Sequence, residues 1–296
     1  MHPVLDHIVI LVPHQTLQTL PTWITDNFTV LNGGTHADGT TENKLIVFQD
    51  RTYLELIAFV EGLDPEKRAQ HRWGRRSEGH IVDWAMTMFT DDNYPGAGRE
   101  NPEVEFQQVQ KRVRDSQFRV GYEDPVAGGR TTPAGKVLKW STSSPGAFKK
   151  FYKNGQPAFS GGGLPFWCLD RTPRSWRVPH EDPANVNHPS KVVGIAGVTV
   201  LFNDDDLWHW PEKLEGVYDA IANSKPSPTT INEWEFQVPV TSGGRGWILR
   251  LEAVLGRRIP DVSVHLKFFT KGEARKISGK FVDGHELEFE LVKVDK

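Results

Sequence analysis

The sequence has little cysteine, little net charge and no long apolar run, and each shortage excludes a class of protein. One cysteine, Cys168, among 296 residues excludes an internal disulfide framework and fits a reducing compartment. A formal net charge of -3 offers no field to attract a polyanion, so we expect no nucleic-acid partner. No apolar run reaches the roughly 18–20 residues that a membrane helix needs, and Met1–Asp6 lacks the basic and apolar regions of a secretion signal. These shortages predict a soluble, cytoplasmic protein with no membrane association.

The composition that remains is that of a globular protein with a sizeable core. Hydrophobic residues make up 38% of the chain and charged residues 25%, both ordinary values. A chain of 296 residues is too long for one small core. It therefore predicts one large domain, two domains or a set of repeated modules.

The order of expected elements repeats along the chain. Residues 5–12 read as a strand, residues 14–28 as a helix that Pro21 could break, Asn32–Gly34 as a turn before a polar loop, and residues 44–49 and 52–60 as a hairpin. A second round has strands at 81–88, 130–140 and 164–170 with a helix at 103–116, and a third has a strand at 192–202, a helix at 211–222 and strands at 233–240, 247–255, 262–269 and 286–294. We expect an α+β protein of repeated βαβββ modules, at 1–80, 81–178 and, more divergent, 190–296, whose mixed sheets form cups.

Two ionisable residues lie inside strands that are otherwise apolar. His7 interrupts the run Leu5–Val12, and Glu55 lies in the middle of Thr52–Phe59. An ionisable group in such a run costs several kcal/mol unless an ion pair or a metal compensates it. Imidazole and carboxylate together suit a divalent cation, although a satisfied core histidine and a glutamate paired with an arginine would explain both residues as well.

These residues carry a family resemblance. Leu5–Val12 resembles the first-strand signature of the vicinal oxygen chelate superfamily, which includes glyoxalases, extradiol dioxygenases and bleomycin-resistance proteins. The segments Gly33–His36, Thr41–Asn43 and Tyr53–Ile57 resemble, more narrowly, the glyoxalase-like domain family. Weaker matches complete the set: Trp73-Gly74, Asp83–Ala85 and Pro165–Cys168.

The resemblance implies a site in a sheet-lined cup. His7 and Glu55 match two metal-ligand positions of the superfamily, which implies a divalent metal (Fe, Mn, Zn or Ni), and His36 would be a further ligand or proton carrier, with Glu55 also catalytic. The expected enzyme is of lyase, isomerase or dioxygenase type. The second module departs from the pattern, because Trp84 stands at its first-strand ligand position. On its last strand Cys168, Leu169 and Asp170 stand where a histidine or glutamate is expected, so His36, Asp170 or another histidine would have to complete the site.

Further residues are candidates for substrate contacts. Trp73 and Arg76 belong to a basic run that could fold over the cup, with an arginine clamping a carboxylate. Arg171 and Arg174 follow directly after a module's last strand, where pockets open. We also expect Trp84 to contact the substrate. Solvated surface positions are the ordinary alternative for the arginines.

Three functions remain open on the sequence alone. The first is a small-molecule enzyme acting on a carbonyl- or hydroxyl-bearing metabolite, and the second is a metal-free protein that sequesters a ligand, as in bleomycin-resistance relatives. The third is a scaffold in which His7 and Glu55 are merely satisfied inside the core. We expect a monomer or a homodimer.

Overall fold

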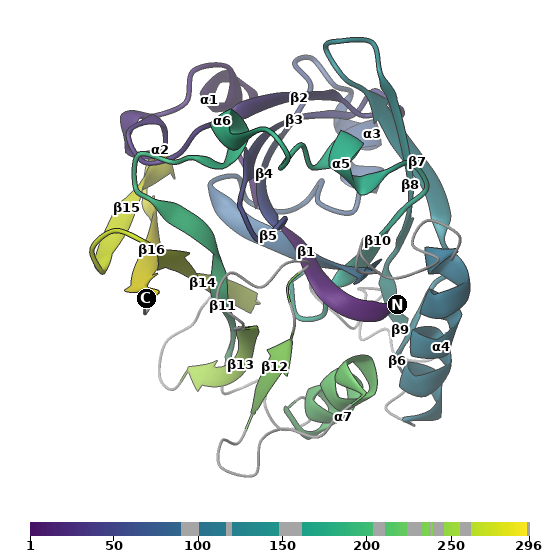
Figure 1. Ribbon diagram of the computed structural model, residues 1–296. Helices are drawn as coiled ribbons and strands as arrows, with labels where there is room; N and C mark the ends of the chain where they lie inside the picture. Colours follow the sequence, from purple (N-terminus) through teal and green to yellow (C-terminus); the bar gives the residue numbers. More distant parts are fainter. Residues whose placement is uncertain are drawn as a thin grey trace.

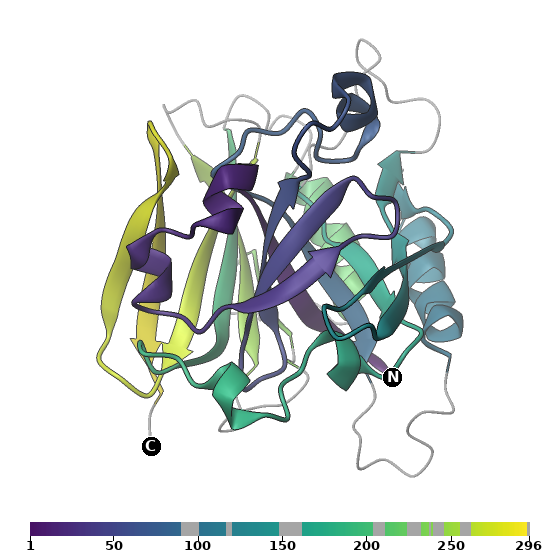
Figure 2. The ribbon, with the colours of Figure 1, turned by 90° about the horizontal axis from the view of Figure 1, so that it is seen from above.

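The computed structural model describes residues 1–89, 101–116, 120–147, 162–203, 211–223, 232–236, 238, 246–254 and 262–294. In this part of the chain the strands form an eight-stranded, a six-stranded and a two-stranded sheet. The eight-stranded sheet curls into a cup, and the six-stranded sheet packs against the outside of that cup (Figure 1, Figure 2).

The first two modules build the eight-stranded sheet. Its order is β2 (Leu31–Thr35), β3 (Thr41–Val47), β4 (Tyr53–Phe59), β1 (His2–Leu11), β5 (His80–Phe89), β10 (Phe166–Asp170), β8 (Val137–Ser143) and β7 (Val126–Thr131). The two modules meet where β1 pairs antiparallel with β5. A single bridge between His36 and Arg130 brings the two edges of the sheet together, so the cup is nearly closed.

Short elements complete this half of the chain. The helices are α1 (His14–Gln18), α2 (Thr22–Thr25), α3 (Pro65–Gln70), α4 (Pro102–Asp115), α5 (Arg174–Arg177) and α6 (Pro183–Val186), and β6 (Val120–Tyr122) pairs with β9 (Pro145–Ala147). Asp64 and Asn101 cap α3 and α4 by accepting hydrogen bonds from backbone N–H groups, and a proline begins each helix.

The described C-terminal strands follow the strand order of the first sheet, with one strand fewer in each half. Its order is β12 (Glu233–Phe236), β13 (Trp247–Val254), β11 (Val192–Asn203), β14 (Val262–Thr270), β16 (His285–Lys293) and β15 (Arg275–Val282), with α7 (Pro211–Ala222) between β11 and β12. β11 pairs with β14 as β1 pairs with β5, and both pairs have two register shifts. Only residues 271–274 separate β14 from β15, whereas a helix is the next element after each of β1, β5 and β11.

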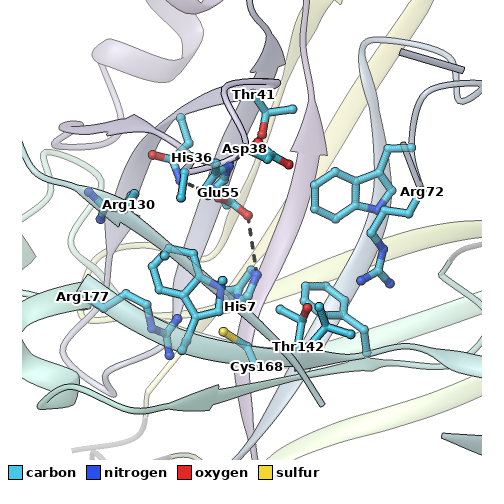
Figure 3. Close-up of a pocket in the computed structure, with 18 of the residues that line it drawn as sticks. His7, His36, Asp38, Thr41, Glu55, Arg72, Arg130, Thr142, Cys168 and Arg177 are labelled. Carbon is cyan, nitrogen blue, oxygen red and sulfur yellow. Dashed lines mark hydrogen bonds and ion pairs between the residues drawn. The ribbon is translucent and has the colours of Figure 1, made fainter. Parts of the chain in front are cut away.

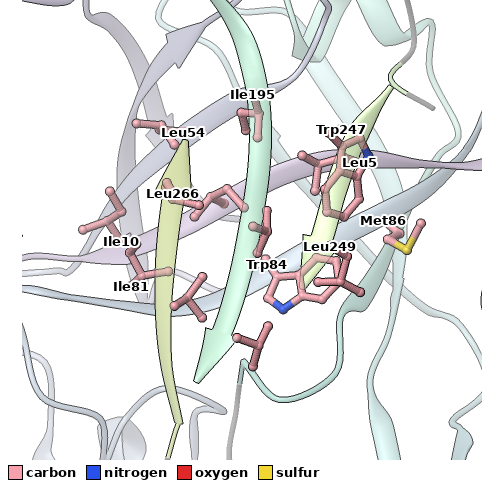
Figure 4. Packing of buried hydrophobic residues seen from close by; sticks show 14 of the residues in the cluster. Leu5, Ile10, Leu54, Ile81, Trp84, Met86, Ile195, Trp247, Leu249 and Leu266 are labelled. Carbon is pink, nitrogen blue, oxygen red and sulfur yellow. The ribbon is translucent and has the colours of Figure 1, made fainter. Parts of the chain in front are cut away.

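One hydrophobic core joins the two sheets. Trp84 and Leu54 from the outer face of the cup meet Ile195, Trp247 and Leu266 of the second sheet (Figure 4). Because β1 is covered on both faces, it reads as a continuous apolar run rather than as an alternating one. The larger core cluster therefore lies outside the cup. A smaller cluster, which includes Trp140 and Phe166, lies inside the cup and leaves space beside it for a site.

The structure confirms the α+β class with repeated modules and cupped mixed sheets, and it corrects several elements. Asn32–Gly34 lies in the edge strand β2 rather than in a turn, and β15 was not predicted. Pro21 divides the expected helix 14–28 into α1 and α2, since proline cannot donate the helical hydrogen bond. The expected strands at 233–240 and 247–255 extend partly outside the described residues.

Candidate active site

A cavity of about 310 Å³ opens inside the cup. Strands of both N-terminal modules, the loop after β2, the loop before β5 and helix α5 contribute to its wall (Figure 3). The residues that line it include His7, His36, Asn43, Tyr53, Glu55, His71, Arg72, Trp73, Arg130, Trp140, Phe166, Cys168 and Arg177.

The Glu55 carboxylate lies between two histidines. His7 Nε2 is 3.5 Å from Glu55 Oε2, and His36 Nε2 is 3.7 Å from Glu55 Oε1 (Figure 3). His7 and Glu55 approach because β1 and β4 are adjacent parallel strands, whereas His36 comes from the loop that follows β2. The structure thus brings together three residues that are far apart in the sequence.

A buried carboxylate fixes the orientation of His7. Asp6 Oδ2 is 2.8 Å from His7 Nδ1, and Asp6 is fully buried. Burial alone would raise the pKa of Asp6, but the guanidinium groups of Arg174 and Arg177 outweigh it and hold this pKa well below its usual value. An ionised Asp6 accepts the Nδ1 proton of His7, and this contact turns Nε2 of His7 toward Glu55 and the cavity.

An amide fixes the orientation of Glu55. Asn43 Nδ2 donates to Glu55 Oε1 at 2.5 Å. Asn43 itself fills the space beside Gly33, where a Cβ atom would lie 1.9 Å from Asn43 Oδ1. Gly33 is therefore required by the close packing that positions Glu55.

Burial adjusts the protonation of several cavity groups. Burial lowers the pKa of His36, and the nearby Arg130 lowers it further against the attraction of Glu55. His71 falls to a pKa of about 4, mainly through burial. Burial also raises the pKa of the Cys168 thiol well above its usual value, which leaves it protonated and a poor nucleophile.

The donor set fits half of a divalent metal site. His7 and Glu55 have the right chemistry and face each other, and the carboxylate behind His7 is typical of a metal-ligating histidine. In the described part of the chain, however, no three His, Cys, Asp or Glu side chains are arranged to hold a metal ion. The second module offers Cys168 and Phe166 toward the cavity, and the latter cannot bind a metal.

The expected substrate contacts are only partly in place. Trp73 lines the cavity, and its Nε1 donates to Asp83 Oδ2 at 2.9 Å. Arg76 does not line the cavity, and Arg171 is exposed and paired with Glu103. Arg174 is partly buried against Asp6 and so supports the site from behind rather than reaching into it.

Trp84 requires a correction. It is fully buried in the core between the two sheets, and its Nε1 donates to the Gly162 carbonyl oxygen at 2.9 Å. Successive residues of a strand point to opposite faces, and Trp84 points away from the cup. It therefore cannot contact a ligand in this cavity.

Sequence reasoning did not assign Asp6, Asn43, Arg130 or Trp140 to the site. The sequence could have indicated a role for Asp6, because it is a second ionisable residue directly before His7 in an apolar strand and so also needs a partner. Arg130 and Trp140 had none, since only the curling of the sheet brings β7 and β8 opposite His36.

The fold and this site define a cupped protein of paired βαβββ modules with a histidine–carboxylate cluster in the first cup. A family model described as glyoxalase-like domain matches residues 5–214. The chain therefore belongs to the glyoxalase-like domain family.

One solved structure shares this fold over nearly its whole length. A hypothetical protein from Staphylococcus aureus is 13% identical with a TM-score of 0.65, the match covering 99% of this chain and 100% of that one. A variant of 4-hydroxymandelate synthase from Streptomyces coelicolor is 14% identical with a TM-score of 0.41, covering 90% of this chain and 71% of that one. Among curated proteins none matches the sequence. No helix in the described ranges is both long enough and apolar enough to span a membrane.

Proposed function

We propose that this protein is a small-molecule enzyme of lyase or isomerase type that moves a proton on a carbonyl- or hydroxyl-bearing metabolite. The observation that carries the proposal is the Glu55 carboxylate between His7 and His36, at 3.5 and 3.7 Å, in a cavity of about 310 Å³. A positioned imidazole and a neighbouring carboxylate are the usual pair for general acid–base catalysis.

The residues have distinct roles in this proposal. His7 accepts a proton at Nε2 from the carbon next to the substrate carbonyl, and Asp6 stabilises the imidazolium that forms. Glu55 and His36 hold a second proton, which passes to the carbonyl oxygen when His7 removes the proton from carbon. This proton returns to them when the carbonyl group forms again. Tyr53 stacks on the His7 ring with centroids 4.6 Å apart and helps to hold it in place.

The family resemblance makes a divalent metal the alternative way to use the same pair. His7 and Glu55 would be its ligands from this chain, and a bound metal would polarise the substrate carbonyl. The experiment below distinguishes this case from metal-free proton transfer.

The test is hydrogen exchange in deuterated water, followed by NMR for a panel of small carbonyl compounds, together with metal content by plasma mass spectrometry. We expect the wild type to exchange the hydrogen next to one carbonyl, and His7→Gln and Glu55→Gln to lose about 10²–10⁴-fold in rate. The exposed His265→Gln is the matched control and should exchange at the wild-type rate. Near-stoichiometric metal in the wild type that both site variants lose would favour the metal-dependent mechanism over metal-free proton transfer.

Ligand sequestration is the second candidate function. Four aromatic side chains line the cavity and could hold an apolar ligand without chemistry: Tyr53, Trp73, Trp140 and Phe166. Tight ligand binding without exchange on any compound would favour this function over catalysis. A folded protein that binds neither ligand nor metal would leave only a scaffold role.

A further inference from the structure

Arg130 is a buried cation that contacts no counterion among the residues the structure describes. Its side chain lines the cavity beside His36, and the residue is only 5% exposed (Figure 3). In the described part of the chain its side chain makes one hydrogen bond, from Nη1 to the Gly33 carbonyl oxygen, and no carboxylate there lies within ion-pair distance. A guanidinium has five N–H donors, so most of its hydrogen-bonding capacity remains unused.

The other cavity arginines are already neutralised. Arg72 Nη2 donates to Asp83 at 2.8 Å. Arg177 binds both Asp6 and Asp170 and also donates to the Tyr53 hydroxyl. Arg130 differs from them because no carboxylate of the described residues neutralises it. An unpaired buried charge is costly, and an anionic ligand that bound Arg130 would reduce this cost.

Glu55 does not serve as that partner. It is close enough to influence Arg130 electrostatically, yet its oxygens face Asn43, His7 and His36 rather than the guanidinium. A planar guanidinium binds a carboxylate through two parallel hydrogen bonds, which a histidine or an amide cannot reproduce.

We propose that Arg130 anchors the carboxylate of a small monocarboxylate ligand, and that this anchor selects acids over neutral analogues. The inference rests on the proposed function, because the anchor would hold an acid substrate with its reacting carbon toward His7 and Glu55. A cavity of about 310 Å³ lies at the small end of ligand sites and suits a metabolite of modest size. Trp140 and Phe166 provide apolar walls for the rest of the molecule.

The test compares binding of an acid with binding of its uncharged amide. Phenylacetate with phenylacetamide, and acetate with acetamide, are titrated into the wild type while binding is measured by calorimetry, with the intrinsic tryptophan fluorescence as a second readout. We expect the acid of at least one pair to bind about tenfold or more tightly than its amide, since a charged hydrogen bond is lost with the amide. Equal or undetectable binding of acid and amide in both pairs would overturn the proposal.

Two variants locate the effect. Arg130→Met should abolish the preference for the acid, whereas Arg72→Met should keep it, because Asp83 already neutralises Arg72. Retention of the preference in Arg130→Met would also overturn the proposal. If Arg130→Met does not fold, Arg130→Lys replaces it in the experiment. Lysine keeps the charge but cannot form the bidentate hydrogen bonds of a guanidinium, so the preference for the acid should become smaller without disappearing. An unchanged preference in Arg130→Lys would overturn the proposal.

The anchor and the enzymatic proposal can fail separately. His7→Gln removes the proposed base but leaves Arg130, so it should still prefer the acid. A preserved preference in a protein that exchanges no hydrogen would support the anchor and contradict the enzyme. Exchange on neutral carbonyl compounds without any preference for acids would support the enzyme and contradict the anchor.

Discussion

Asp6 connects two networks, and its charge matters to both. On one side it accepts from His7, and on the other it pairs with Arg174 and Arg177, which also share Asp170. Every member is buried or nearly so, so the charges are balanced by each other rather than by water. Removal of one charge would leave an unpaired guanidinium in a medium that solvates it poorly.

We expect Asp6→Asn to lower the free energy of unfolding by about 3–5 kcal/mol, the usual cost of breaking a buried ion pair. Denaturant unfolding measures this cost. Glu78→Gln, which breaks the more exposed pair with Arg68, is the matched control and should cost less than about 1 kcal/mol. Equal costs for the two variants would contradict a buried charge network around Asp6.

His188 supplies a pH-dependent contribution to stability away from the site. Its Nε2 lies 3.0 Å from the Val47 carbonyl oxygen and its Nδ1 accepts from the Thr29 N–H, an arrangement that requires the neutral ring. Burial lowers the pKa of His188 from 6.5 to about 4. The unfolded chain therefore binds the proton more readily than the folded chain between pH 4 and 6.5, and the folded state loses stability as the pH falls through this window.

The corresponding variant is His188→Gln, compared with the exposed His265→Gln. Between pH 7 and pH 4 the wild type should lose about 2 kcal/mol more of its unfolding free energy than His188→Gln does. His265→Gln should follow the wild type at every pH. Parallel pH profiles for the wild type and His188→Gln would show that His188 does not titrate in this way.

At the scale of elements, the contact between β2 and β3 decides how Glu55 is held. β3 carries Asn43 and pairs with β2 on one side and with β4, which carries Glu55, on the other. Gly33 lies in β2 with a backbone conformation open to any residue, so only the space taken by Asn43 demands glycine here. A side chain at this position would push Asn43 away from Glu55.

We expect Gly33→Ala to lower the unfolding free energy by about 1–3 kcal/mol through overpacking and to reduce turnover or ligand binding at the same time. Gly146→Ala is the control, because its Cβ would make only ordinary contacts, at 3.5 Å from Glu123. A Gly33→Ala protein with unchanged stability and activity would mean that Asn43 does not hold Glu55 in place.

At the scale of the whole molecule, the two sheets share one core. Trp84 from β5 stacks with Tyr218 of α7 and meets Trp247 of β13 edge to face. On the other side of the contact, Trp23 of α2 packs on Phe281 and Phe289 of the last two strands. Neither sheet can lose this interface without exposing apolar surface, so both should unfold together.

Trp84→Ala tests this coupling. The cavity it leaves should cost about 3–5 kcal/mol and should lower the midpoint of unfolding for both sheets equally, as followed by hydrogen exchange at β3 and at β16. Trp176→Ala, which truncates a side chain that is 41% exposed, is the control and should have little effect. Two separate transitions would show that the sheets are independent units.

Hydrophobic patterning and ionisable residues made much of this protein predictable from its sequence. The order of strands and helices follows from local periodicity, and His7 and Glu55 stood out because a charge inside an apolar strand must have a reason. Patterning failed at β2, where the glycines that suggest a turn instead make room for Asn43.

Only the tertiary structure decided which residues meet. The curling of the sheet places Arg130 and Trp140 beside His36, more than 90 residues away in the chain, and the alternation of strand faces sends Trp84 into the core. The tertiary structure also places Arg174 behind the cavity, whereas Arg177 lines the cavity wall. Sequence patterns determine which elements form because those depend on neighbouring residues, whereas the contents of the cup depend on register and curvature, which the packing of the whole sheet determines.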